Sequence, residues 1–112
     1  MDRAAVLDRV EGDVELLKQL VDLFQEDSAR LLRDIRAALD SRDAQALRRS
    51  AHALKGSVGN FAASSAFDAA LKAELLAHDG ELTGAEEAVR VLESEVEALN
   101  VELSSFAKEL TS

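Results

Sequence analysis

The chain has 112 residues, a formal net charge of −9, no proline and no cysteine, which fits one helical domain spanning residues 1–112. The negative charge argues against a nucleic-acid partner, and the lack of cysteine excludes disulfides, thiol nucleophiles and cysteine-based zinc sites. The first residues are polar and no apolar run approaches the roughly 20 residues of a membrane span, so we expect a cytoplasmic protein without a signal peptide or membrane contact.

Helical periodicity begins near the N-terminus. A short first helix is predicted over about Arg3–Val10 and ends at Gly12, and Asp13 can cap a second, longer helix. The second helix has apolar residues three, four and seven positions apart over about 25 residues, with the single polar residue Ser28 among them. This stripe consists of Val14, Leu17, Val21, Phe24, Leu31, Ile35 and Ala38, widened by Leu20, Leu32 and Leu39.

Residues 40–43 form a predicted turn in which Asp43 caps a third helix over about Ala44–Phe61. A fourth helix is predicted to begin at Ser64 or Ser65. Its inward-facing residues are expected to be Phe67, Ala70, Leu71 and Leu75.

Residues 78–80 are predicted to close the fourth helix, since Gly80 suits a left-handed C-cap. A fifth helix then starts at Thr83 or Gly84 and keeps a heptad spacing throughout. Its stripe consists of Ala85, Val89, Leu92, Val96, Leu99, Leu103, Phe106 and Leu110.

Long helices joined by short loops pack as antiparallel neighbours. We therefore predict an all-α fold, an antiparallel up-down four-helix bundle with the short first helix across one end. The heptads of the fifth helix also allow an intermolecular coiled coil. The bundle is the better prediction because the stripes of the other helices need covering as well.

The most informative run is AHALKGSVGN at residues 51–60. At about 100° per residue, with His52 taken as zero, Lys55 lies near −60°, Gly56 near +40° and Gly59 near −20°. The apolar residues of this helix lie on the opposite side. His52 is therefore predicted to point away from the core. Three cations (Arg48, Arg49 and Lys55) and two residues without side chains are expected around it.

Each glycine costs a helix interior roughly 1 kcal/mol relative to alanine. Gly56 and Gly59 beside an exposed histidine therefore indicate that something must approach closely. The alternative is that the helix ends near Gly56 and that the glycines form a C-cap. Val58 and Phe61 argue against it, because they continue the apolar stripe past both glycines.

No Asp or Glu occurs from residue 44 to residue 67, while Arg48, Arg49 and Lys55 lie in this segment. Such a basic region in an acidic chain is suited to an anion such as a phosphoryl group. It can equally be a solvated helix face whose charges happen to be positive.

An exposed neutral imidazole can attack a phosphoryl group and form an N–P bond. Lys55, one turn beyond His52, can then reach the phosphoryl oxygens. A metal site fits less well, because the other histidine, His78, falls in a predicted loop and the basic segment supplies no carboxylate. The chain has no glycine-rich nucleotide loop, so we expect no ATP site and no kinase activity of its own.

The run HALKGS at 52–57, followed by GNF at 59–61, resembles the signature of histidine-containing phosphotransfer (Hpt) domains. The resemblance covers nearly the whole chain. One departure is Ala62-Ala63, where the family often has Gly-Ala, and it bears on where the helix ends. The other similar segments are Phe24, 31–35 and 37–43 upstream, and 73–74 and 79–82 downstream.

The resemblance implies a four-helix bundle without catalytic machinery, which carries phosphoryl groups between aspartates of receiver domains in a multistep phosphorelay. It implies that His52 is the phosphoacceptor through Nε2, that Lys55 screens the phosphoryl charge and that Gly56 allows close docking. Glu74 can orient the ring by accepting a hydrogen bond from Nδ1, or it can be a solvent-facing glutamate. No cofactor is implied for this chain, since the receiver would hold any Mg²⁺.

We expect a receiver domain to dock on the face around His52, through Ala53, Gly59, Arg48 and Arg49. The arginines would meet the acidic mouth of the receiver, although they can also serve solubility alone. His78 is expected to be a loop residue without a function, and the protein to be a monomer.

Three other functions are compatible with parts of this pattern. The domain can be the phosphoacceptor domain of a chemotaxis-type kinase, or a helical module that docks receivers without being phosphorylated. The dimerisation helices of a sensor kinase fit worst. Their histidine is normally followed by an acidic residue and soon by a proline, whereas here Ala53 follows and the chain has no proline.

Overall fold

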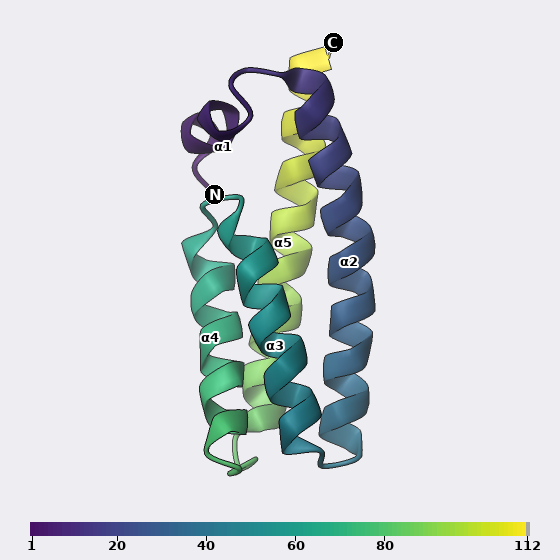
Figure 1. Cartoon of the computed structure of the whole chain (residues 1–112), viewed down its shortest axis with the longest axis vertical. Coiled ribbons are helices and arrows are strands. Elements are labelled where there is room, and N and C mark those ends of the chain that lie inside the picture. Colours follow the sequence, from purple (N-terminus) through teal and green to yellow (C-terminus); the bar gives the residue numbers. More distant parts are fainter. Residues whose placement is uncertain (112) are drawn as a thin grey trace.

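The computed structural model describes residues 1–111, which form five α-helices and no strand. The helices are α1 (Arg3–Arg9), α2 (Val14–Asp40), α3 (Ala44–Gly59), α4 (Ser64–His78) and α5 (Ala85–Thr111). In Figure 1, α2 to α5 run alternately down and up along the long axis, and α1 lies across one end. The all-α up-down bundle with an extra N-terminal helix is therefore confirmed. None of these helices is long and apolar enough to cross a bilayer.

Aspartate side chains fix the starts of the first three helices. Asp2, Asp13 and Asp43 each accept, through Oδ1, a hydrogen bond from the backbone N–H three residues later, at 3.0–3.1 Å. Such a cap satisfies one of the unpaired N–H groups of the first turn and typically contributes about 1 kcal/mol. The start of α3 is thereby set eight residues before His52.

The core runs through the whole bundle and is built mainly from aliphatic side chains, with three buried phenylalanines. Its largest fully buried members are Leu17, Ile35, Leu47, Leu54, Leu92 and Leu103. At one end Phe24 of α2 packs edge-to-face on Phe61, with 5.0 Å between ring centroids. Because α5 buries its stripe inside this core, the alternative of an intermolecular coiled coil is wrong.

Helix α3 ends two residues earlier than predicted. Its last residue is Gly59 and its C-cap is Asn60, although Phe61 is still buried. The chain then turns at Ala62, whose φ is 50°, a left-handed conformation that costs a non-glycine residue about 1–2 kcal/mol. Gly56 lies inside α3, so the alternative in which it ends the helix is wrong.

Helix α4 buries a face of small residues. Its five buried residues are Ala66, Ala69, Ala70, Ala73 and Ala77. Of the predicted inward residues, Ala70 is buried, Phe67 and Leu71 are half-buried, and Leu75 is 53% exposed. The prediction for Leu75 was wrong because the alanine stripe, not the larger leucines, faces α3 and α5 and lets the helices approach closely.

Polar side chains link α2 to α5. Ser28 is fully buried, and its Oγ accepts a hydrogen bond from Asn100 Nδ2 at 3.3 Å. One turn away, Gln25 Nε2 donates to Ser104 Oγ at 2.8 Å. The first pair gives the buried Ser28 hydroxyl a partner, while the buried Asn100 Oδ1 has no hydrogen-bond partner among the described residues.

An ion-pair cluster links the same two helices farther along. Arg36 Nη1 lies 2.8 Å from Glu86 Oε2, and Arg36 Nη2 lies 2.6 Å from Glu93 Oε1. Hydrogen bonds to Glu86 and then Glu93 raise the pKa of Arg36, and the same contact with Arg36 lowers the pKa of Glu86. The α2–α5 seam is thus cross-linked by polar side chains of the same chain.

Candidate functional site

The central turn of α3 presents His52 to solvent. Its neighbours Ala51 and Leu54 are fully buried and anchor this turn in the core. The His52 side chain is 67% exposed. The helix therefore holds its backbone rigidly while the imidazole remains open to a large partner.

A single carboxylate on α4 contacts two side chains of α3. Glu74 Oε2 lies 2.7 Å from His52 Nδ1, and Glu74 Oε1 lies 2.7 Å from Lys55 Nζ. The Glu74 side chain is only 16% exposed, so the alternative of a solvent-facing glutamate does not describe it. Contact across the α3–α4 seam thus joins three of the residues singled out in the sequence.

Lys55 turns toward α4. Its side chain is 21% exposed, and Nζ lies 6.0 Å from the centroid of the half-buried Phe67 ring, within range of a cation–π interaction. The Lys55 ammonium, and to a lesser extent the hydrogen bond with His52, holds the pKa of the Glu74 carboxyl below its usual range, although burial opposes this. Glu74 is therefore ionised at neutral pH.

The contact with Glu74 assigns the proton of the imidazole. An ionised carboxylate only accepts hydrogen bonds, so the ring nitrogen 2.7 Å away must be the donor. In the neutral ring, Nδ1 then carries the proton and Nε2 keeps a free lone pair. The geometry thus selects Nε2 as the nucleophilic nitrogen of His52.

The two glycines of α3 have different surroundings. Gly56 is exposed, and a Cβ built on it would meet no atom within 4 Å. A Cβ on Gly59 would lie 3.9 Å from the Phe67 ring of α4. Gly56 therefore leaves open space beside His52, as Ala53 does with its small exposed side chain, whereas Gly59 lies against the neighbouring helix.

The two predicted docking arginines are exposed and lie on different sides of α3. Arg48 faces α4, where its Nη1 lies 3.0 Å from Nδ1 of His78. Arg49 faces α2 and lines a shallow hollow together with Asp34. His78 is the last residue of α4 and not, as predicted, part of a loop.

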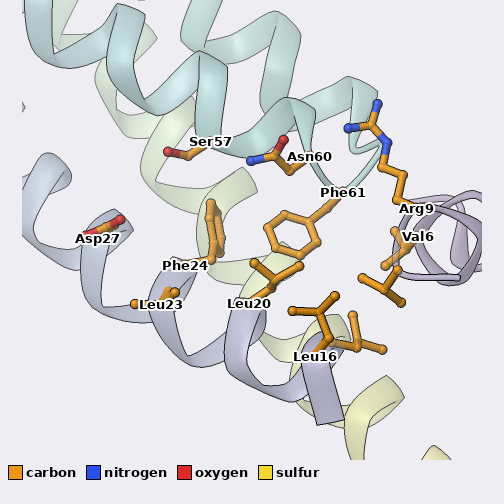
Figure 2. Close-up of a pocket in the computed structure, with 12 residues that line it drawn as sticks. Val6, Arg9, Leu16, Leu20, Leu23, Phe24, Asp27, Ser57, Asn60 and Phe61 are labelled. Atoms are coloured by element: carbon orange, nitrogen blue, oxygen red, sulfur yellow. The ribbon is translucent and has the colours of Figure 1, made fainter. Parts of the chain in front are cut away.

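A groove near the site was missed in the sequence. It lies between α1, the first half of α2 and the end of α3, with a volume of about 490 Å³. Figure 2 shows Ser57 of α3 and its C-cap Asn60 above the Phe24 and Phe61 rings, with Leu16, Leu20 and Leu23 below. These three leucines are 36–55% exposed.

The exposure of these leucines shows that one prediction was wrong, although the sequence does contain a signal for it. Leu20 was placed on the buried stripe of α2, but it lines the groove instead. Leu16, Leu20 and Leu23 follow a second i, i+4, i+7 row beside the core stripe. Two adjacent apolar rows on one helix indicate one buried face and one face available to a partner.

Among residues 1–111, no group of three or more His, Asp or Glu side chains lies close enough to bind a metal ion.

Comparison with known protein families identifies the family of this chain. The family model of the Hpt domain matches residues 19–102, three-quarters of the sequence. This chain belongs to the Hpt family. The crystal structure of histidine-containing phosphotransfer protein B (HptB) from Pseudomonas aeruginosa PAO1 is similar to it, with a TM-score of 0.91 and 29% sequence identity over 97% of this chain and 95% of that chain. A comparison with curated proteins found no match.

Membership in the Hpt family supports a histidine phosphotransfer role, since Hpt domains are phosphocarrier modules that work with receiver domains in phosphorelays. The matched part of this Hpt domain contains His52, Lys55, Gly56 and Glu74. It leaves out α1, which forms one wall of the groove.

Proposed function

We propose that this Hpt domain is a phosphotransfer intermediate of a multistep phosphorelay, in which His52 accepts a phosphoryl group from one receiver aspartate and passes it to another. One observation carries the proposal. The imidazole is exposed, and Glu74 holds its Nδ1 at 2.7 Å, so that the other nitrogen is free to react. A domain used only for docking would not need a ring oriented in this way.

The transfer itself requires little from this chain. The Nε2 lone pair attacks the phosphorus of the receiver's acyl phosphate, an N–P bond forms, and the P–O bond to the carboxylate breaks with its electrons remaining on that carboxylate. The receiver supplies any Mg²⁺. This domain contributes position, because α3 is fixed in the core and Glu74 restricts the rotation of the ring.

Two neighbours have distinct proposed roles. Lys55 is paired with Glu74 in the resting state, and its flexible side chain can also reach oxygens on a phosphorylated Nε2 one turn away. Gly56 leaves the space through which the receiver approaches the ring. Lys55 thus screens phosphoryl charge, and Gly56 permits close contact.

The receiver docks on the surface around His52 and on the neighbouring groove. Ser57 and Asn60 on the groove rim follow His52 by roughly 7–12 Å along α3. The groove offers the apolar contact area of a docking interface through Leu16, Leu20 and Leu23. Arg49 and Ala53 extend this surface past the ring, while Arg48 and Gly59 border it on the α4 side.

The proposal is tested by phosphate uptake. The domain is incubated with candidate phosphorylated receivers and with phosphoramidate, a small phosphodonor, and acid-labile phosphate on the domain is measured. We expect the wild type to be labelled and His52→Gln to be unlabelled with native helical content by circular dichroism. His78→Gln is the matched control and should be labelled like the wild type. Labelling of His52→Gln, or an unlabelled wild type, would contradict the proposal.

A further inference from the structure

Glu74 contacts the nitrogen of His52 that does not take up the phosphoryl group. Its Oε2 lies 2.7 Å from Nδ1, and its side chain is largely buried between α3 and α4. This contact does not involve Nε2, so it can persist when Nε2 is phosphorylated. The carboxylate is therefore positioned to face the ring in both states of the cycle.

The proton on Nδ1 decides how well a phosphohistidine donates. When an acceptor carboxylate attacks the phosphorus, the N–P bond breaks and its electron pair returns to Nε2. If Nδ1 carries a proton, the leaving group is neutral imidazole. If Nδ1 has lost that proton, the leaving group is the strongly basic imidazolate anion, and donation is slow.

We propose that Glu74 retains the Nδ1 proton of phosphorylated His52 and thereby keeps the phosphohistidine an efficient donor. This inference rests on the proposed function and extends it from the accepting step to the donating step. A phosphorylated ring protonated on Nδ1 is cationic, and a carboxylate at 2.7 Å favours the cationic form through charge and hydrogen bonding. Glu74 acts through the ring and is a positioning residue, not a catalytic one.

Atoms and charges balance over the cycle with a single proton. On acceptance, neutral imidazole with a proton on Nδ1 forms the N–P bond through Nε2 and becomes cationic. On donation, the N–P bond breaks, the acceptor oxygen gains the phosphoryl group, and the ring returns to the neutral form with the same proton on Nδ1. No acid or base elsewhere in the chain has to act.

Lys55 opposes the effect of Glu74. Its Nζ lies 2.7 Å from Glu74 Oε1, so its positive charge offsets part of the attraction between the carboxylate and a cationic ring. Removing Glu74 should therefore lower the pH at which the phosphorylated ring loses its Nδ1 proton, and removing Lys55 should raise it. The charged or titratable side chains facing this part of α3 are Arg48, Arg49 and Lys55 on α3 itself, Glu74 and His78 on α4, and Asp34 on α2.

The test is a ³¹P NMR pH titration of the intact domain loaded with phosphoramidate, because the phosphorus shift follows protonation of Nδ1. Relative to the wild type, we expect the midpoint of Glu74→Gln to fall by about one pH unit, and that of Lys55→Met to rise. Glu97→Gln is the matched control. It removes the same charge from an exposed position on α5, a helix that packs on α2 and α4. It should leave the midpoint unchanged.

A second readout is donation to a receiver. Above the wild-type midpoint, Glu74→Gln should donate about tenfold more slowly, because one pH unit corresponds to a tenfold change in the protonated fraction. Below both midpoints the two rates should converge. A merely structural role for Glu74 would slow donation equally at every pH.

The outcomes separate this inference from the proposed function. Equal midpoints in wild type and Glu74→Gln overturn the inference while phosphate uptake on His52 still supports the function. If Glu74→Gln lacks native helical content, Lys55→Met decides, and a midpoint that does not rise overturns the inference. A wild type that takes up no phosphate overturns both.

Discussion

The α2–α5 and α3–α4 seams of this bundle are built in different ways. The α2–α5 seam is cross-linked by polar side chains, including Arg36, which is paired with two glutamates. The α3–α4 seam is lined with alanines on the α4 side, and its one carboxylate, Glu74, faces both Lys55 and His52.

The difference shows how one fold separates stability from reactivity. Between α2 and α5, Arg36 pairs with both Glu86 and Glu93, so these charged groups find their partners within the seam. Between α3 and α4, the face of small residues leaves room at the surface for the carboxylate of Glu74. This carboxylate contacts only one of the two ring nitrogens of His52. The second ring nitrogen of His52 is left for a partner.

The largest effect is expected from enlarging the alanine face. Ala70 is fully buried in α4, so Ala70→Leu should lower the free energy of unfolding by about 1–3 kcal/mol through overpacking. Urea denaturation measures it. Leu75→Ala, at an exposed position of the same helix, should change stability by less than about 0.5 kcal/mol. Equal effects of the two substitutions would mean that the seam is not tightly packed.

Gly56→Ala should separate folding from transfer. A Cβ at this position meets no atom within 4 Å, and alanine is the better helix former, so the variant should gain about 1 kcal/mol of stability. Phosphotransfer from a receiver should nevertheless slow, because the methyl group fills the docking space. Uptake from phosphoramidate, which needs no docking, should be unchanged. Faster or equal transfer from the receiver would contradict the role of Gly56.

Arg36→Gln tests the polar seam. We expect it to lose about 0.5–1 kcal/mol of unfolding free energy, and less at high salt, because a partly exposed ion-pair network is screened. Arg90→Gln, which breaks only exposed pairs within α5, is the matched control. If both variants lose the same amount, the link between α2 and α5 adds nothing beyond ordinary surface pairing.

The smallest effect is the acid dependence of Glu74. Folding lowers the pKa of this carboxyl, chiefly through Lys55, so its contribution to stability is present above its ordinary value of 4.5 and is lost as the pH falls through the folded pKa. The stability gap between wild type and Glu74→Gln should therefore narrow as the pH falls from 7 to 3 in urea titrations. A gap that is constant with pH would contradict the pairing, and Glu97→Gln controls for removal of a distant charge.

Much of the fold could be read from the sequence because its signals are local. Asp13 and Asp43 mark helix starts through their own side chains, and large apolar residues repeat with a clear period along α2 and α5. The outward direction of His52 follows from the same periodicity. Alanine gives a weak signal, so the inward face of α4 was assigned partly to Leu75.

The details of the site depend on how two helices pair, and periodicity does not report that. Nothing within α3 indicates that Lys55 turns to Glu74, or that Arg48 reaches His78. These contacts depend on the axial alignment of α3 with α4, which the alanine face and the strained turn at Ala62 determine. The resemblance to Hpt domains suggested Glu74, but only the packed helices give its distance to the ring.

Two hydrogen-bonded pairs, Ser28 with Asn100 and Gln25 with Ser104, help to set the axial position of α5 relative to α2. Sliding α5 past α2 by one turn, about 5.4 Å, would break both pairs. The two pairs therefore favour the observed axial offset of α2 and α5. Because α2 carries Leu16, Leu20 and Leu23, this offset also sets where the groove proposed for docking lies along the bundle.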